Sequence, residues 1–365
     1  MRGEIVWLLA YDVAFELKKD AVAAALAERG PRYRKAGRYR RAPGGVMLFS
    51  PLVVELPECE LPGLPGRLVR PTAKFFSAGA LSISLRVDFD ARSLDDLMPF
   101  RAMADAEGEG PHLLARQLAE ELVEMARPGL VRPCASWDRC EDYTVVCITE
   151  SEGLEDGTMR WLEARRAQVA ALLLGEGPAE ELSEQQVEES LRHAYSFGKT
   201  DLAVVEWDGM LVVETRTSYE ELLYVAEAAN VQLVEMRAHD EVLDKAIDRA
   251  YEDLDHYYDR PALFREPARL AHSLREQKID LARIADQIYN VSKFFGDWHL
   301  ARIYEALELR FHLAEWQDQL EEKLRTVDSL YQIIAKEKTD RSMFVLELAI
   351  VVLFVLDLLI ILIHG

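Results

Sequence analysis

The segment at residues 343–363 constrains this chain more than any other. It reads MFVLELAIVVLFVLDLLIILI, and its only charged side chains are Glu347 and Asp357. A helix of this length extends about 31 Å, roughly the thickness of the hydrocarbon core of a bilayer. Its apolar side chains favour insertion by roughly 5 to 10 kcal/mol, whereas each acid opposes insertion by at most about 3.5 kcal/mol. The segment predicts a C-terminal transmembrane helix, with a buried core helix as the alternative.

Charges next to this segment predict its orientation. Lys336, Lys338 and Arg341 precede it, and His364 is the one basic residue that follows. Basic residues tend to remain on the cytoplasmic side of a membrane, so the body of the chain is expected in the cytoplasm. We therefore predict a tail-anchored, single-pass protein of the cell inner (cytoplasmic) membrane, with the lipid bilayer as a partner.

The chain as a whole is strongly acidic, with a net charge of −21 over 365 residues. This charge opposes broad binding to nucleic acid or to an anionic membrane face. Residues 29–41 (RGPRYRKAGRYRR) are unusual because they contain no acid. Their basic residues are Arg29, Arg32, Arg34, Lys35, Arg38, Arg40 and Arg41. With tyrosines interleaved, this basic patch is typical of a site for RNA, phosphate or anionic lipid, whereas the simpler interpretation is a solvated loop that balances the chain's own acid.

The pattern of residues 1–215 predicts an α/β cytoplasmic domain. Segments rich in β-branched residues predict strands at 5–17, 46–54, 81–89 and 143–149. Helical patterns occupy 21–28, 94–105, 112–125, 159–174 and 185–194, although Pro99 weakens the second of these. Asp208-Gly209, between two apolar runs, predicts a β-hairpin with a type I′ turn.

The rest of the chain is predicted to be helical. A connecting helix spans 216–260, a coiled-coil-like helical hairpin forms a stalk over 261–342, and the membrane anchor follows at 343–363. Apolar residues of the last stalk helix recur at heptad spacing, with Lys323 as the defect: Leu309, Leu313, Trp316, Leu320, Val327, Leu330 and Ile334. This seam can close an antiparallel hairpin within one chain or join copies in a homo-oligomer, and the two can coexist.

Acidic residues recur every four positions on the connecting helix. The candidates for a metal site there are Asp240, Asp244, Asp248, Glu252 and His256. Helical spacing places the acids on one face, where they would bind a divalent cation or, as we favour, meet Arg and Lys of a neighbouring helix. Residues 193–200 (HAYSFGKT) look like a damaged phosphate loop, but the first glycine is replaced by His193 and a helix is expected before it, so we do not favour nucleotide binding there. We predict no metal, no cofactor and no enzymatic activity.

The two acids of the anchor are ten positions apart, hence about 15 Å along a helix. In lipid, Glu347 and Asp357 would be neutral carboxyls bonded between helices of an oligomer, or would form a path for protons or ions.

Two segments resemble a known family. Residues 298–334 (WHLARIYEALELRFHLAEWQDQLEEKLRTVDSLYQII), with the acid pair Glu347 and Asp357 after them, are similar to the C-terminal half of the required-for-meiotic-nuclear-division family, which includes the fungal Sad-interacting factors. Residues 190–212 (SLRHAYSFGKTDLAVVEWDGMLV) resemble its helix and following β segment, through Leu202 and Glu206. The resemblance implies a membrane-anchored, oligomeric organiser without known catalysis. Its mitochondrial members support translation by tethering ribosomes, and the composition here suggests a prokaryotic member.

These observations predict a tail-anchored, homo-oligomeric membrane scaffold or tether, by resemblance linked to translation at the membrane. The alternative is an oligomeric ion channel or transporter with a cytoplasmic α/β domain. An enzyme is the third possibility, and no catalytic motif supports it.

The basic patch allows a direct test. Neutralising Arg34, Lys35, Arg38 and Arg40 should weaken any binding to ribosomes, RNA or anionic lipid and lower its salt dependence by up to about four ion equivalents. Titration of the full chain with RNA and with anionic vesicles over a range of salt concentrations measures this. Binding that depends neither on the salt concentration nor on these substitutions would show that the basic patch is not the binding site.

Overall fold

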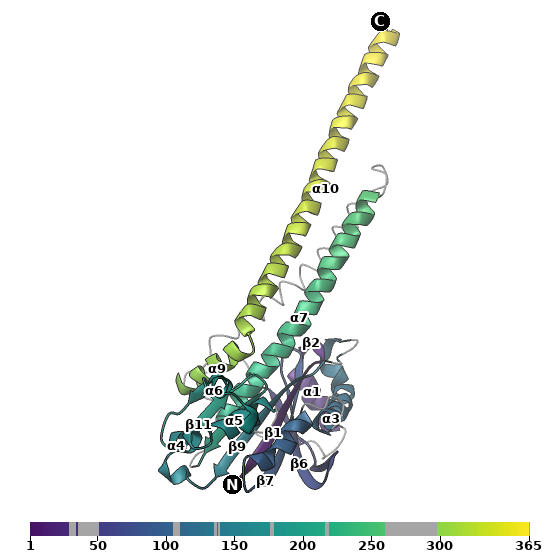
Figure 1. Ribbon diagram of the computed structural model, residues 1–365. Coiled ribbons are helices and arrows are strands. Elements are labelled where there is room, and N and C mark those ends of the chain that lie inside the picture. Colours follow the sequence, from purple (N-terminus) through teal and green to yellow (C-terminus); the bar gives the residue numbers. More distant parts are fainter. Residues whose placement is uncertain are drawn as a thin grey trace. The chain divides into compact units, whose positions relative to one another are not determined.

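The computed structural model describes residues 1–28, 34–35, 51–104, 110–134, 137, 139–175, 179–215, 219–259 and 298–364. The chain divides into two compact units. The first unit comprises Met1–Ala238 and Asn290–Glu315, and the second comprises His239–Tyr289 and Trp316–Gly365. The first unit is an α/β domain with a large sheet, as predicted (Figure 1).

The strands of the first unit are β1 (Arg2–Asp12), β2 (Ala14–Leu17), β3 (Arg34–Lys35), β4 (Leu52–Glu55), β5 (Cys59–Leu61), β6 (Leu64–Phe75), β7 (Ala80–Asp90), β8 (Leu130–Pro133), β9 (Glu141–Glu150), β10 (Ala194–Tyr195), β11 (Asp201–Val205) and β12 (Gly209–Glu214). The order across the main sheet is β10-β11-β12-β9-β1-β7-β6-β4-β3, and β5 pairs with β6. Strands β2 and β8 form a separate pair.

Among the described residues, seven α-helices lie wholly in the first unit: α1 (Lys19–Glu28), α2 (Met98–Ala104), α3 (Gly110–Ala126), α4 (Thr158–Glu163), α5 (Arg166–Leu174), α6 (Glu184–Ser190) and α9 (Trp298–Arg310). Helix α7 (Glu220–Asp259) begins in the first unit and continues into the second. Helix α10 (Leu313–His364) lies almost wholly in the second.

The centre of the sheet has a recognisable topology. Strands β1, β6, β7 and β9 with helices α1 and α3 follow the chain order βαββαβ and the spatial order β9-β1-β7-β6. Strand β1 is antiparallel to both of its neighbours, β7 and β9. This is the split βαβ, or ferredoxin-like, arrangement. Beyond it, β12 extends the sheet by pairing parallel with β9.

Strict alternation divides the two faces of this sheet. On β7, Leu81, Ile83 and Leu85 point into the main hydrophobic core, which α1, α3 and α5 complete from the same side. The alternate residues Ser82, Ser84 and Arg86 point to the opposite face, and a period of two requires this. A second, small core on that face joins Ala10 and Phe76 to Val231 and Val234 of α7.

Helix α7 covers the opposite face largely through polar groups. Buried Lys74 forms an ion pair with buried Glu227, and the Ser82 hydroxyl donates to the same carboxylate at 2.7 Å. Nearer the start of α7, both terminal nitrogens of Arg86 donate to Glu220, at 2.6 and 2.8 Å. The helix is therefore positioned by specific charge pairs as well as by apolar packing.

Several predicted elements are present with altered boundaries. The predicted strand at 5–17 is two strands, β1 and β2, and the predicted helix at 159–174 is α4 followed by α5. Pro99 occupies the first turn of α2, where its missing N–H is not needed. Strand β6 was not expected, because Pro65, Gly66 and Pro71 within it argue against a strand.

The predicted hairpin forms, but its turn differs. Strands β11 and β12 pair antiparallel up to Val205 and Met210. Gly209 does not have the positive φ that a type I′ turn requires. A Cβ at Gly209 would lie 3.0 Å from the Thr144 carbonyl oxygen, so this glycine permits the close approach of β12 to β9.

The predicted transmembrane helix is wrong. Among the described residues, no helix combines the length and apolar character needed to cross a membrane. Residues 343–363 are the last part of the longer helix α10, and Glu347 and Asp357 leave about nine apolar residues between them, or about 14 Å of helix. The tail anchor and the inner-membrane location rested on this span and are wrong with it, whereas the bilayer as a partner stays a prediction. The first part of the predicted helical hairpin, residues 261–297, lies outside the described residues.

The buried pair beneath α7 can be tested by removing one partner. Lys74→Met would leave the Glu227 carboxylate buried without a cation, so the free energy of unfolding should fall by about 3 to 5 kcal/mol. Adding Glu227→Gln should recover most of the loss, because a neutral amide still accepts from Ser82. Arg127→Met removes an exposed ion pair in the same unit and should change it by less than about 0.5 kcal/mol. Urea denaturation measures all three, and equal effects of Lys74→Met and Arg127→Met would contradict the assignment.

Candidate functional site

The second unit pairs two parallel helices. Beyond Ala238, α7 runs beside α10, and both helices run in the same direction (Figure 1). Lys323 Nζ of α10 lies 2.5 Å from Asp240 Oδ1 and 2.6 Å from Asp244 Oδ1 of α7. The cation that interrupts the apolar seam of α10 therefore neutralises two of the aspartates that were candidates for a metal site. Asp248 and Glu252 are exposed, and the structure does not describe the side chain of His256.

No set of three His, Cys, Asp or Glu side chains is placed to hold a metal ion in the parts of the chain that the structure describes. The pairing with Lys323 gives the physical reason at Asp240 and Asp244, because an ammonium group already supplies the positive charge there. The absence of metal and cofactor remains a prediction.

The residues of the predicted seam do not share one environment. Leu320, Val327 and Leu330 of α10 are buried within the second unit, as are Leu243 and Ala250 of α7. Trp316 is half-buried, and the side chain of Ile334 is outside the description. Three seam positions are thus already covered in a single copy of the chain.

The seam is also interrupted before α10 begins. Leu309 belongs to α9 and is exposed, whereas Leu313 at the start of α10 is buried. Between them His312 has a φ of 52°, in the left-handed region that ends a helix. Phe311 packs edge-to-face on Tyr143 of β9, with ring centroids 5.1 Å apart. Heptad spacing alone does not reveal such a corner.

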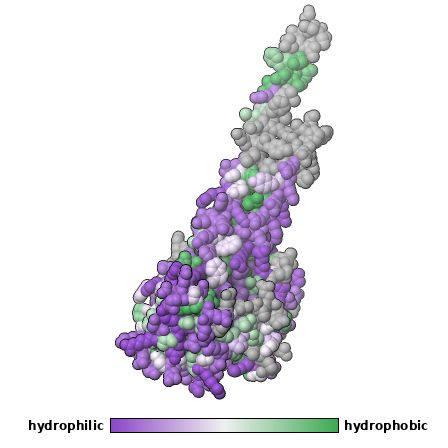
Figure 2. Space-filling model, viewed as in Figure 1, coloured by the Kyte–Doolittle hydropathy of each residue, from purple (hydrophilic) through white to green (hydrophobic). Residues whose placement is uncertain are grey.

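An apolar stretch of α10 is left uncovered. Every side chain of residues 350–356 is between 49% and 69% exposed, and Figure 2 shows this stretch as a hydrophobic zone on the helix. Seven consecutive positions span almost two helical turns and so point in all directions around the axis. Glu347, just before the stretch, is exposed, and the side chain of Asp357 is outside the description. A helix that is apolar all round is normally buried.

The damaged phosphate loop is closed by its own chain. The backbone N–H groups of Phe197 and Gly198 donate to the two carboxylate oxygens of Asp201, each at 2.6 Å. A phosphate loop uses such N–H groups to bind phosphate oxygens. Here a carboxylate occupies them, so the loop is not arranged to bind a nucleotide.

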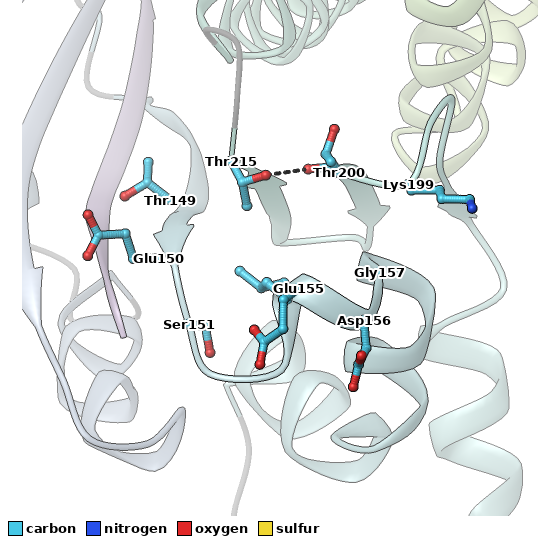
Figure 3. Close-up of a pocket in the computed structure, with 10 residues that line it drawn as sticks. Thr149, Glu150, Ser151, Glu155, Asp156, Gly157, Lys199, Thr200 and Thr215 are labelled. Carbon is cyan, nitrogen blue, oxygen red and sulfur yellow. Dashed lines mark hydrogen bonds between the residues drawn. The ribbon is translucent and has the colours of Figure 1, made fainter.

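A polar pocket of about 600 Å³ lies next to this loop, where the parallel strands β9 and β12 end (Figure 3). Its lining includes the carboxylates of Glu150, Glu155 and Asp156. Glu150 pairs with Arg2 at 3.3 Å, and Glu155 accepts from the Gly153 N–H at 3.1 Å. The three acids are exposed, so water competes with any ligand for them.

Side chains of the basic patch lie outside the described residues. Only the backbone of Arg34 and Lys35 is described, as strand β3, which pairs antiparallel with β4 through Arg34 with Glu55 and Lys35 with Val54. The partners proposed for this patch remain a prediction.

Together these features define a protein with a split βαβ sheet domain followed by long paired helices. Residues 2–220 match the model of the family described as "Uncharacterized protein MJ0711, N-terminal domain", and the chain belongs to this family. The uncharacterized protein MJ0711 of Methanocaldococcus jannaschii is 24% identical over 247 residues, which cover 67% of this chain and 72% of that protein. The family match contains every strand of the sheet and ends at the start of α7.

The resemblance to the required-for-meiotic-nuclear-division family is therefore wrong. Residues 190–212, on which it partly rested, lie inside the MJ0711 match. Leu- and Glu-rich heptads, as in residues 298–334, are common to amphipathic helices generally and identify a helix better than they identify a family. The link to ribosome tethering that followed from this resemblance loses its basis.

The burial of the seam predicts what a truncation in it would do. Leu320→Ala should destabilise the second unit by about 2 to 5 kcal/mol, because it leaves a cavity at a fully buried position. Gln319→Ala, one position earlier and exposed, should change stability by less than about 0.5 kcal/mol. Hydrogen exchange in α10 measures the loss and sedimentation measures the native mass. A lower mass in Leu320→Ala would show that this part of the seam joins copies.

Proposed function

We propose that this chain is a self-associating scaffold protein in which helix α10 binds a second copy of itself through residues 350–356. The observation that supports the proposal is the exposure of this apolar stretch around the full circumference of the helix. Large exposed apolar surfaces mark interaction sites. The membrane tether and the ion channel both require a membrane span, and neither enters the proposal.

The free energy gained by burying the stretch is comparable to the cost of association. Covering one large side chain that is half exposed contributes about 1 kcal/mol. Two copies of the stretch together contribute on the order of 10 kcal/mol, within the range of about 4 to 15 kcal/mol that association costs in lost freedom. The stretch by itself therefore about offsets the cost of association, and neighbouring parts of α10 would add to the gain.

Charge favours a second copy through this stretch over any other surface. The net charge of −21 makes two copies repel one another elsewhere. Residues 350–356 contain no charge, and an identical helix presents the same uncharged length to cover them. Added salt should therefore strengthen association, because it screens the repulsion and leaves apolar burial intact.

The scaffold proposal makes one variant decisive. Leu353→Lys places a charge at the middle of the stretch, so the dissociation constant of the dimer should rise at least tenfold. Gln332→Lys adds the same charge at an exposed position of α10 before the stretch and should leave association nearly unchanged. Sedimentation equilibrium of the full chain at 50 and 500 mM salt measures both variants and the salt effect. A wild-type chain that stays monomeric at tens of micromolar, or equal effects of the two lysines, would refute the proposal.

A further inference from the structure

Helix α7 lies along β1 and presents a series of carboxylates and amides to the sheet. The Tyr219 hydroxyl, just before α7, donates to Glu4 Oε1 at 2.9 Å, near the start of β1. Further along, Asn230 Nδ2 donates to the carbonyl oxygens of Leu8 and Glu141, at 3.3 and 2.8 Å. The helix and the strand are thus in register, and residues near 235 reach the end of β1.

Most carboxylates in this interface have a cation. Glu220 is held by Arg86, Glu227 by Lys74, and Glu141 by Arg237, whose Nη1 lies 2.6 and 2.7 Å from its two oxygens. Such pairing offsets the high cost of removing a carboxylate from water. The next acid on the sheet-facing side of α7, Glu235, differs from these three in its surroundings.

Among the described residues, no cation pairs with the buried Glu235. Its side chain is 8% exposed, and its Oε1 atom has no hydrogen-bond partner within the same part of the chain. The ionisable group that acts on it is another acid, Asp12 at the end of β1. Asp12 accepts from the thiol of Cys134, in the segment after β8, at 3.5 Å, and thiols are weak donors. Arg237, two positions further along α7, is bound to Glu141.

Two carboxylates cannot both remain charged in such surroundings. Burial, and then the charge of Asp12, raise the pKa of Glu235 to about 8. Burial likewise raises the pKa of Asp12 to about 6, partly opposed by its bond from Cys134. At neutral pH the protonated form of Glu235 is favoured, and a proton takes the place that Lys74, Arg86 and Arg237 take at the other carboxylates.

We propose that Glu235 and Asp12 form a proton-binding site that locks this part of α7 onto the end of β1, and that loss of the proton loosens the helix there. The evidence is geometric: in an interface where Glu220, Glu227 and Glu141 each have a cation, a buried carboxyl with an unpartnered oxygen lies near a second acid. The site regulates the attachment of α7 to the sheet, independently of whether α10 binds a second copy.

The pH range follows from the direction of the shifts. Both acids have a higher pKa in the folded state than in an opened state, where ordinary values of 4.5 and 3.8 apply. Their stabilising contribution is complete below those ordinary values and is lost as the pH rises through the folded values. Between pH 6.5 and 7.5 Asp12 is mostly charged in both states, so Glu235 contributes most of the change. Local opening should then increase about tenfold per pH unit.

Hydrogen exchange of the amides at residues 231–238, corrected for the intrinsic pH dependence of exchange, tests this. In the full wild-type chain, protection should fall about tenfold from pH 6.5 to 7.5. E235Q keeps the size of the side chain and cannot ionise, so its protection should be independent of pH. E235L removes the polar group and should behave in the same way. The matched control is E241Q on the same helix, which should retain the wild-type slope.

Two results would overturn the proposal. Wild-type protection that does not change with pH would show that Glu235 holds no titrating proton. An equal slope in wild type and E235Q would assign the titration to another group. D12N supplies a further requirement: without the neighbouring charge the pKa of Glu235 should fall, so the loss of protection should begin at the same pH but end at a lower one.

Discussion

The buried ion pair between Lys74 and Glu227 is the interaction on which the arrangement of the first unit depends. It joins the sheet to α7, and the Ser82 hydroxyl completes the coordination of the carboxylate. Charges buried in this way are costly if their partner shifts, so the pair permits only one register of helix on strand. Arg86 of β7 and Glu220 at the start of α7 form a second ion pair that holds the helix in the same register. The position of the apolar residues Val231 and Val234 against Ala10 then follows.

The negative charges of the acids on α7 are neutralised in three ways. In the first unit, Glu220 and Glu227 are paired with cations of the sheet. In the second unit, Asp240 and Asp244 share Lys323 of α10. Glu235 lies between these two groups along α7 and has no cation among the residues that the structure describes, so protonation is the way in which it becomes neutral. Helix α7 thus carries several acids held in ion pairs and one acid, Glu235, that is neutralised by a proton.

Much of the sheet domain is predictable from sequence, because its strands alternate or are continuously apolar. Residues 81–89 and 143–149 are inside β7 and β9, and the hairpin of β11 and β12 is present. Strand β6 could not be predicted, since its prolines and glycine act against a strand unless neighbours hold it. The turn at Gly209 differs because packing against Thr144, rather than turn geometry, requires the glycine. The membrane span and the family resemblance were wrong because apolar content and heptad spacing describe a helix without describing what surrounds it.

The sequence by itself determined the α/β character of the first half, the helical character of the second and the presence of an uncharged apolar stretch at residues 350–356. These properties are local, since they arise from the spacing of neighbouring side chains. Only the tertiary structure decided which charges meet. Lys74 and Glu227 are 153 positions apart, and Arg237 is 96 positions from Glu141. The spacing of residues along the chain does not predict such pairs, because they form between segments that are distant in sequence. Burial in a shared low-dielectric interface makes some carboxylates ion-pair partners and leaves another, Glu235, to bind a proton.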